Sequence, residues 1–155
     1  YRSRGMLRPE PSGWGVKCAC GLRLDPAGPG LRTFDRAMND ILQKIVNETP
    51  GARAAILMGF DGIAVDQFVD PDVEDPDIES MAMEFSFRFI ELRTAAESLG
   101  MGALSDITVK AEFGTFLVRV LTEEYFSATL LGETGHFGKG RWLLRSTAPQ
   151  LAGEL

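Results

Sequence analysis

One glycine-rich stretch has the residue types of a phosphate-binding loop. Residues 130–141 read LLGETGHFGKGR; they follow an apolar run typical of a strand and precede WLLRSTA, which could be helical. A strand, a glycine-rich loop with a lysine, and a helix together cradle the phosphates of a nucleotide. The loop of that class has the spacing G-x-x-x-x-G-K-[ST], so that backbone amides surround the phosphates and a hydroxyl contacts Mg²⁺.

The spacing of this stretch does not match that pattern. If Gly138 and Lys139 were the G-K pair, Glu133 would stand where the first glycine belongs and Gly140 where the hydroxyl belongs. The dinucleotide pattern G-x-G-x-x-G fails as well, because no acidic residue follows about 20 positions later at the end of a second strand. We therefore interpret the stretch as a connection whose glycines permit positive φ, and we expect no cofactor.

The other chemically capable side chains do not form a recognisable catalytic or metal-binding set. His136 is the only histidine, and no motif holds a Ser or Cys beside it. The acidic run from Asp70 to Asp77 lacks the glycine and the terminal glutamate of a calcium loop. We expect a solvated loop there, no bound metal, and a protein that is not an enzyme.

Two arginines of the segment 77–99 could stabilise a phosphoryl group as an arginine finger does. Arg88, however, has Glu84 four residues before it and Glu91 three residues after it, which predicts a surface ion pair. Arg93 is the second arginine of this kind.

Composition allows one packed domain in this chain of 155 residues, of which 45% are hydrophobic and 25% charged. The net charge of −6 argues against a nucleic-acid partner. No apolar run approaches the roughly 20 residues of a membrane span, and none resembles a secretory signal, so we expect no membrane insertion. Cys18 and Cys20 are too close for an ordinary disulfide and too few for a structural zinc site, which indicates a reduced, cytoplasmic protein.

The charge is unevenly distributed along the chain. Residues 1–36 contain seven Lys or Arg against three Asp or Glu, with many Pro and Gly and little apolar periodicity. We expect residues 1–32 to be a disordered arm and residues 33–155 to form the domain. The arm could also be a non-native extension, because the segment that begins at Met38 has the composition of a complete domain.

Sequence patterns predict the elements that must position these residues. A helix is expected from Thr33 to Glu48, with Thr33 or Asp35 as its cap. Two strand-like runs follow, joined by Asp61-Gly62 in a tight primed turn that needs positive φ at both positions. After a helix over 77–99 come the strand-like runs ALSDITVKAE, TFLVRVL and YFSATLLG, of which the first suits a sheet edge and the last a central strand. A last helix near 136–151 would pack through Phe137, Trp142, Leu144 and Leu151, and Pro149 could kink or end it.

The helix over 77–99 has apolar residues on two opposed faces. At 100° per residue, one stripe is expected to face the core: Ile78, Met81, Ala82, Phe85, Phe89, Leu92, Ala96 and Leu99. Met83, Phe87 and Ile90 fall on roughly the opposite face, with Thr94 beside them. If these three side chains stay exposed to solvent, the protein loses roughly 5–9 kcal/mol of stabilisation that their burial would contribute. A second face of this kind favours a protein interface, although a helix sandwiched within its own chain, or ordinary scattered exposure, would also account for it.

The predicted order is helix, two strands, helix, three strands, helix, which is an α+β fold with a five-stranded antiparallel sheet. This order resembles the roadblock/dynein light chain family, and in particular its bacterial MglB-like members. The segments ETPGARAAILMGFDGIAVDQF at 48–68 and RVLTEEYFSATLLGETGHFGKGRWLLRSTAPQL at 119–151 carry the resemblance, which extends from about Phe34 to Leu155.

The resemblance implies a profilin-like sheet, a homodimer formed through the central helix and the strand after it, and binding to a Ras-like small GTPase. Members of this kind act on GTPases without inserting an arginine finger, by repositioning residues that the GTPase already has. Carried over to this chain, the resemblance implies that Met83, Phe87, Ile90 and Thr94 belong to the dimer or GTPase-facing surface. It also implies that the strand with Ile107 and Val109 pairs across a two-fold axis.

Three functions therefore remain open: a dimeric GTPase regulator, which we favour, an assembly scaffold without effect on GTP hydrolysis, and a small-ligand sensor. A sensor needs a cavity with convergent polar groups. The large apolar residues Phe85, Phe89, Phe116 and Phe126 argue instead for a filled core.

Overall fold

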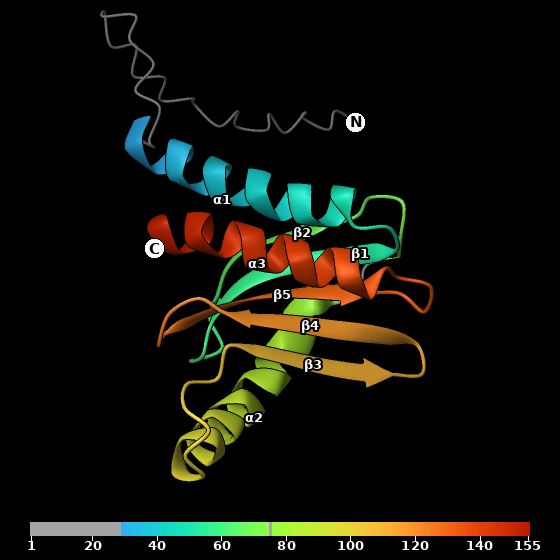
Figure 1. Ribbon diagram of the computed structural model, residues 1–155. Helices are drawn as coiled ribbons and strands as arrows, with labels where there is room; N and C mark the ends of the chain where they lie inside the picture. The colour runs from blue at the N-terminus through green and yellow to red at the C-terminus, as the bar shows by residue number, and fades with distance from the viewer. Residues whose placement is uncertain (1–28, 75) are drawn as a thin grey trace, which may run out of the picture.

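The computed structural model describes residues 29–74 and 76–155, which form three helices and five strands (Figure 1). The predictions for residues 1–28, including most of the arm, Cys18 and Cys20, lie outside the described residues. The elements follow the predicted order: α1 (Pro29–Glu48), β1 (Ala52–Gly59), β2 (Ala64–Val69), α2 (Ile78–Ser98), β3 (Asp106–Ala111), β4 (Gly114–Val120), β5 (Tyr125–Leu131) and α3 (Phe137–Gly153).

The five strands form one antiparallel sheet in the order β2-β1-β5-β4-β3. The registers place Ile56 of β1 opposite Ala128 of β5, and Phe116 of β4 opposite Leu130 of β5. The strand YFSATLLG is therefore central and the strand of Ile107 and Val109 lies at an edge, as the sequence predicted. The small side chains of β5 suit a strand that is covered on both faces.

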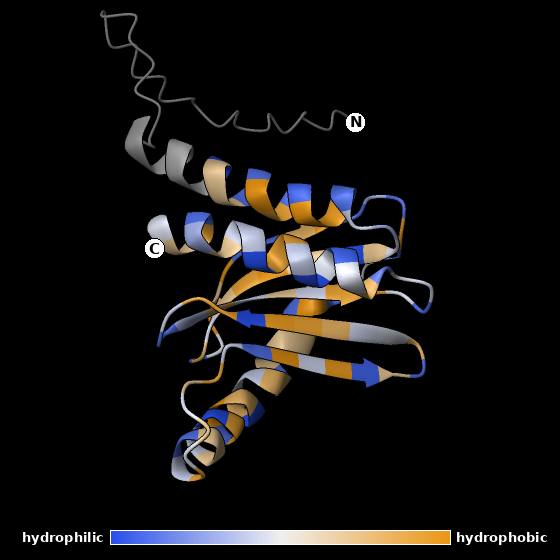
Figure 2. Ribbon diagram, in the orientation of Figure 1, coloured by the Kyte–Doolittle hydropathy of each residue, from blue (hydrophilic) through white to orange (hydrophobic). Residues whose placement is uncertain are grey.

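One face of the sheet is covered by α1 and α3 (Figure 1). Leu42 and Ile45 of α1 are fully buried, as are Leu143 and Leu151 of α3. Figure 2 shows apolar and polar residues on opposite sides of α1, with the apolar side turned toward the rest of the domain. Two amphipathic helices side by side thus bury this face, which is the usual arrangement of a helix layer on a sheet.

The opposite face is covered by α2 alone among the described helices (Figure 1). Aromatic side chains fill the layer between α2 and the strands: the ring centroids of Phe89 and Phe126 are 5.6 Å apart, edge to face, and those of Phe85 and Phe116 are 5.4 Å apart. Phe60 adds a further contact with Phe126 at 5.0 Å. Aromatic pairs at such distances stabilise a core beyond their buried area, so this layer fixes the position of α2 on the sheet.

Two predicted local details differ from the structure. The first helix begins at Pro29, so Thr33 and Asp35 lie inside the helix and not at its start; proline is well tolerated in a first turn, which allows the earlier start. In the β1–β2 connection only Gly62 has positive φ, at 84°, so the turn is not the predicted primed type. The Asp61 side chain accepts a hydrogen bond from the Ile63 amide at 3.1 Å. This hydrogen bond stabilises the turn without a positive φ at Asp61.

The last helix differs in what it buries. Leu144 and Leu151 pack as predicted, but Phe137 is 42% and Trp142 58% exposed. The helix continues through Pro149 to Gly153. The apolar stripe that faces the sheet is made by Leu143, Leu144, Ala148 and Leu151, and it leaves the two aromatic residues on the outer side.

We predict that Phe89→Ala lowers the free energy of unfolding by about 3–5 kcal/mol, because it empties a site that contacts two other rings. Urea denaturation at fixed protein concentration measures the loss. Glu84→Ala, on the exposed side of the same helix, is the control and should change the value by no more than about 0.5 kcal/mol. Equal losses for the two variants would contradict the placement of α2.

Candidate protein-interaction surface

The face of α2 that points away from the sheet carries large apolar side chains. Met83 is 42%, Phe87 58% and Ile90 36% exposed, and Thr94 is exposed beside them. The hydroxyl of Thr94 donates to the carbonyl of Ile90 at 3.0 Å, so its polar group is satisfied within the helix. The two-faced pattern predicted from the sequence is therefore present, and the described part of the chain covers the second face only in part.

The β1–β2 turn adjoins this face. Gly62 comes so close to α2 that a Cβ atom there would lie 3.3 Å from Cγ of Met83. Ile63, the next residue, is 66% exposed. We call Ile63, Met83, Phe87, Ile90 and Thr94 the outer α2 surface.

Ile63 was not predicted to belong to this surface. The available signal was its position directly after Asp-Gly, where a β-branched apolar residue leaves the turn before the strand begins.

The stripe predicted to face the core is only partly buried. Met81 and Phe85 are half-buried against the sheet, but Leu92 is 49% and Leu99 75% exposed. Figure 1 gives the reason: α2 runs obliquely to the strands, and its C-terminal end projects beyond β3. The prediction that Leu92 and Leu99 are core residues was therefore wrong: both lie after Phe89, in the C-terminal part of the helix, where Ala96 is the one buried residue. Met101, just after the helix, is 77% exposed and extends this projecting end.

An apolar groove lies between α2 and the edge strand β3. Its volume is about 360 Å³, and its lining includes Met81, Phe85, Val109 and Phe113. The Phe113 side chain, in the β3–β4 turn, is 72% exposed. Within the described chain β3 pairs only with β4, so its other backbone edge has no strand beside it.

The two β3 residues expected at an interface both point toward the α2 side of the sheet. Ile107 is 8% exposed and belongs to the core, while Val109 is half-buried at the groove. On the α2 side of β3, Val109 is therefore the partly exposed apolar side chain, beside the unpaired backbone edge of the strand. With the projecting end of α2, they form a second apolar surface on the β3 side of the helix, distinct from the outer α2 surface.

The two arginines of α2 are held by neighbours. Arg88 pairs with Glu91 at 3.3 Å, and both side chains are more than two-thirds exposed, at 69% and 68%; the predicted surface ion pair is confirmed. Arg93 donates to the carbonyl of Glu123 at 2.7 Å, and its guanidinium lies 5.1 Å from the Phe60 ring centroid. Arg93 thus ties α2 to the end of the β4–β5 hairpin.

The glycine-rich loop packs against the rest of the domain. The amide of Gly132 donates to the Gly51 carbonyl at 2.8 Å, and the amide of His136 donates to the Pro50 carbonyl at 2.8 Å. A Cβ atom at Gly51, where φ is 76°, would lie 2.7 Å from the Gly135 backbone. These glycines are therefore explained by the close approach of two turns.

His136 has a structural role that the sequence analysis missed. Its Nδ1 accepts a hydrogen bond from the Lys139 amide at 3.1 Å, so the side chain caps the first turn of α3. The signal that could have revealed it is its position directly before a helical segment, three residues ahead of an unsatisfied amide.

The acidic run before α2 includes the cap of that helix, because Asp77 accepts from the Ser80 amide at 3.2 Å. The described residues contain no group of three or more His, Cys, Asp or Glu side chains placed to hold a metal ion. None of the described helices is both long and apolar enough to span a bilayer.

Solved structures similar to this chain include MglC from Myxococcus xanthus, with 37% sequence identity and a TM-score of 0.58 over 77% of this chain and 99% of that one. The gliding protein MglB from Thermus thermophilus shares 20% identity, with a TM-score of 0.70 over 78% of this chain and 89% of that one. A roadblock domain from Streptomyces avermitilis shares 19% identity, with a TM-score of 0.60 over 73% of this chain and 96% of that one. No protein-family model and no curated protein matches the sequence.

These similarities differ in what they establish. The identity with MglC extends over nearly all of that protein, so it reflects common descent. The identities with MglB and the Streptomyces domain are low, so these two support the fold. The sequence itself is thus more similar to MglC than to that MglB structure.

We predict that His136→Ala lowers the free energy of unfolding by about 1 kcal/mol, because the first turn of α3 loses its cap. His136→Asn should keep most of the stability, since an amide oxygen can accept the same hydrogen bond. Thermal and urea denaturation measure both variants. Equal losses in the two would show that the imidazole does something other than capping.

Proposed function

This chain belongs to the roadblock family, with MglC from Myxococcus xanthus as a relative by sequence, and from that premise we propose that it is a non-catalytic, dimeric regulator of a Ras-like small GTPase. The observation that carries the proposal is the outer α2 surface. Met83, Phe87 and Ile90 stand exposed on one continuous face, and contiguous apolar surface of this kind marks sites of protein association.

Two separate surfaces support two separate contacts. The β3 side offers an unpaired strand edge, the groove beside Phe113, and the exposed Leu92 and Leu99. A second copy fits this side, because antiparallel pairing of two β3 strands satisfies both edges and brings the exposed leucines together. The outer α2 surface then stays free for the GTPase.

The arrangement of the arginines supports regulation without an arginine finger. Arg93 is engaged by the Glu123 carbonyl and the Phe60 ring, and Arg88 by Glu91. Contact through Met83, Phe87 and Ile90 supplies binding energy but no charge for a phosphoryl group. The protein would therefore act by fixing the conformation of residues that belong to the GTPase.

The same observation also favours a second candidate, an assembly scaffold that binds the GTPase without changing its rate. An apolar surface that offers no cation to a phosphoryl group can hold a partner without changing the rate of GTP hydrolysis. A small-ligand sensor is less well supported, because Phe85, Phe89, Phe116 and Phe126 occupy the space between α2 and the sheet.

To test the regulatory function, GTP turnover by a Ras-like GTPase from the same genome is measured with and without this protein. We expect at least about a tenfold change in rate or in nucleotide exchange at saturating protein. The Phe87→Glu variant should remove the effect, because a carboxylate replaces an apolar contact. Binding by pull-down with unchanged turnover and exchange would leave the scaffold; no binding at all would overturn both functions.

A pair of variants separates the two surfaces. Leu92→Glu should raise the dimer dissociation constant about tenfold or more, and Phe87→Glu should weaken GTPase binding by a similar factor while the dimer persists. Light scattering measures the first and titration calorimetry the second. Phe137→Glu is the control, because Phe137 is exposed to 42% on α3, on the other face of the sheet. If Phe87→Glu dissociates the dimer and Leu92→Glu does not, the assignment of the surfaces is reversed.

A further inference from the structure

The face of the domain opposite to α2 has a groove of its own, along the outer side of α3. It has a volume of about 430 Å³ and is lined by Gly138, Arg141, Trp142, Arg145 and Ser146. We call it the α3 groove. From Gly138 to Ser146 the helix advances by eight residues, which is about 12 Å. A site of that length accommodates a short peptide segment.

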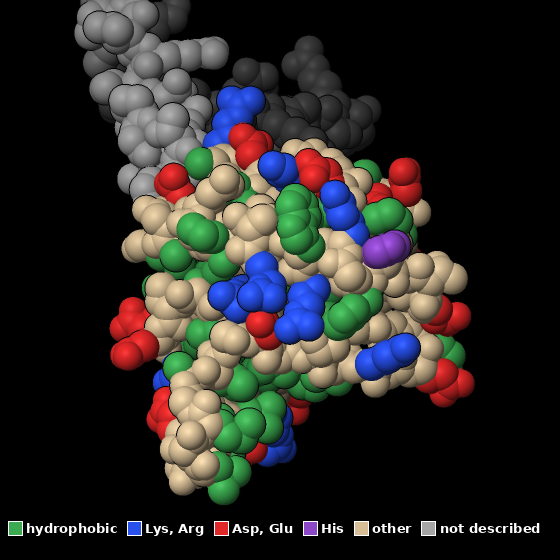
Figure 3. All heavy atoms as spheres, viewed as in Figure 1, with side chains coloured by type: hydrophobic (Ala, Val, Ile, Leu, Met, Phe, Trp, Pro, Cys, Tyr) green, Lys and Arg blue, Asp and Glu red, His purple; other side chains and the backbone are tan. Residues whose placement is uncertain are grey.

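The charge around the α3 groove is positive. Arg141 and Arg145 are one helical turn apart, and both are exposed. Figure 3 shows Lys and Arg side chains gathered in the middle of this face, over α3 and the neighbouring strands. The chain as a whole has a net charge of −6, so this concentration runs against the overall balance.

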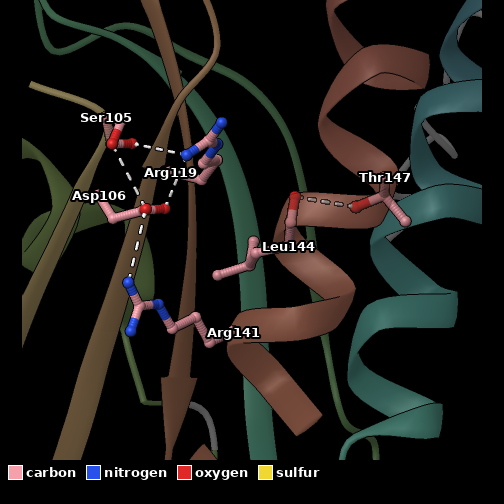
Figure 4. A network of polar contacts seen from close by, with 6 residues as sticks. All are labelled: Ser105, Asp106, Arg119, Arg141, Leu144 and Thr147. Carbon is pink, nitrogen blue, oxygen red and sulfur yellow. Dashed lines mark hydrogen bonds and ion pairs between the residues drawn. The ribbon is translucent and has the colours of Figure 1, made fainter. Parts of the chain in front are cut away.

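The carboxylate of Asp106 forms ion pairs with two arginines, Arg119 and Arg141, and Arg141 lines the groove. Figure 4 shows Asp106 of β3 between Arg119 of β4 and Arg141 of α3. Arg119 lies 3.0 Å from Asp106, and both side chains are mostly buried, whereas Arg141 lies 3.8 Å from Asp106 and its side chain is 49% exposed. Asp106 is thus neutralised by Arg119, and Arg141 keeps donors available for another carboxylate. Arg145 has no ion pair with any residue that the structure describes.

Trp142 supplies an apolar contact beside the two arginines. Its side chain is 58% exposed, and the ammonium of Lys139 lies 4.9 Å from the ring centroid. Stacking by Lys139 holds the ring in place and adds positive charge at the same site. Tryptophan and arginine together are the residues that most often carry the binding energy of an interface.

We infer that the α3 groove binds an acidic segment of a partner protein, one with a carboxylate for Arg141 and Arg145 and an apolar side chain for Trp142. This contact lies on the opposite side of the sheet from the outer α2 surface and is independent of the proposed GTPase contact. Charge complementarity favours this occupant over an extended polyanion. A nucleic acid or an anionic bilayer presents charge far beyond the groove and would meet the rest of an acidic protein.

The test measures fluorescence anisotropy of a short fluorescein-labelled peptide that repeats Glu-Glu-Leu, titrated with the full chain. A Gln-Gln-Leu peptide of the same length is the uncharged reference. We expect the acidic peptide to bind at least about tenfold more tightly than the reference, and the difference to shrink when salt is raised to about 0.5 M. The double variant Arg141→Glu, Arg145→Glu should lose the preference.

Two further variants keep the result interpretable. Trp142→Ala leaves every charge in place and should weaken the acidic peptide severalfold, with an unchanged thermal melting curve. Lys44→Glu reverses a charge at an exposed position of α1, outside the groove, and should stay within about twofold of the unaltered chain. The inference is overturned if the two peptides bind equally, if Lys44→Glu costs as much as the double variant, or if the chain sediments with phosphatidylglycerol vesicles and ignores the peptide. GTPase binding by the double variant should be unchanged, which separates this inference from the proposed function.

Discussion

A five-stranded sheet with a single helix on one face is the constraint on which the rest of this structure depends. Five strands extend over roughly 20–24 Å across the sheet, whereas one helix with its side chains covers about 10 Å. The other face has α1 and α3 and is closed. On the α2 face, the same chain must leave a groove beside β3 and an exposed outer side of the helix. The exposure of Phe87 and Leu92 therefore follows from the architecture, and the proposed association with another polypeptide would cover it.

Much of the fold was predictable from the sequence because its signals are local. The period of two in DITVKA, the small apolar residues of YFSATLLG and the glycines between elements determine strand identity, edge position and element order. The turn at Asp61-Gly62 lies where the sequence predicts it but has a different type, because an aspartate can satisfy a neighbouring amide without positive φ. The start of α1 was not predicted, because a proline in a sequence usually indicates the end of a helix. The first turn of a helix nevertheless accepts proline, and α1 begins at Pro29.

The candidate site was predictable only in part. Helical periodicity gives the direction in which a side chain points, but it does not show which other elements of the fold pack against that side chain. Met83, Phe87 and Ile90 were assigned to an exposed face by angle alone, and they are exposed. Leu92 and Leu99 share the angle of the core stripe but are exposed, because both lie after Phe89, where Ala96 is the one buried residue of α2. Trp142 was expected to pack because it is large and apolar. Its place in one groove with two arginines and next to the ammonium of Lys139 could not be predicted without the helix in position.

The position of β3 at the end of the sheet has a consequence for valency. Antiparallel strands that pair edge to edge are related by a two-fold axis perpendicular to the sheet, and that axis leaves corresponding faces on the same side. Two copies joined in this way would form a ten-stranded platform with both α3 helices above it and both α2 helices below. Each side would carry two equivalent docking sites at a fixed separation. A partner with two suitable segments, or a clustered array of partners, would gain avidity that one copy alone cannot supply.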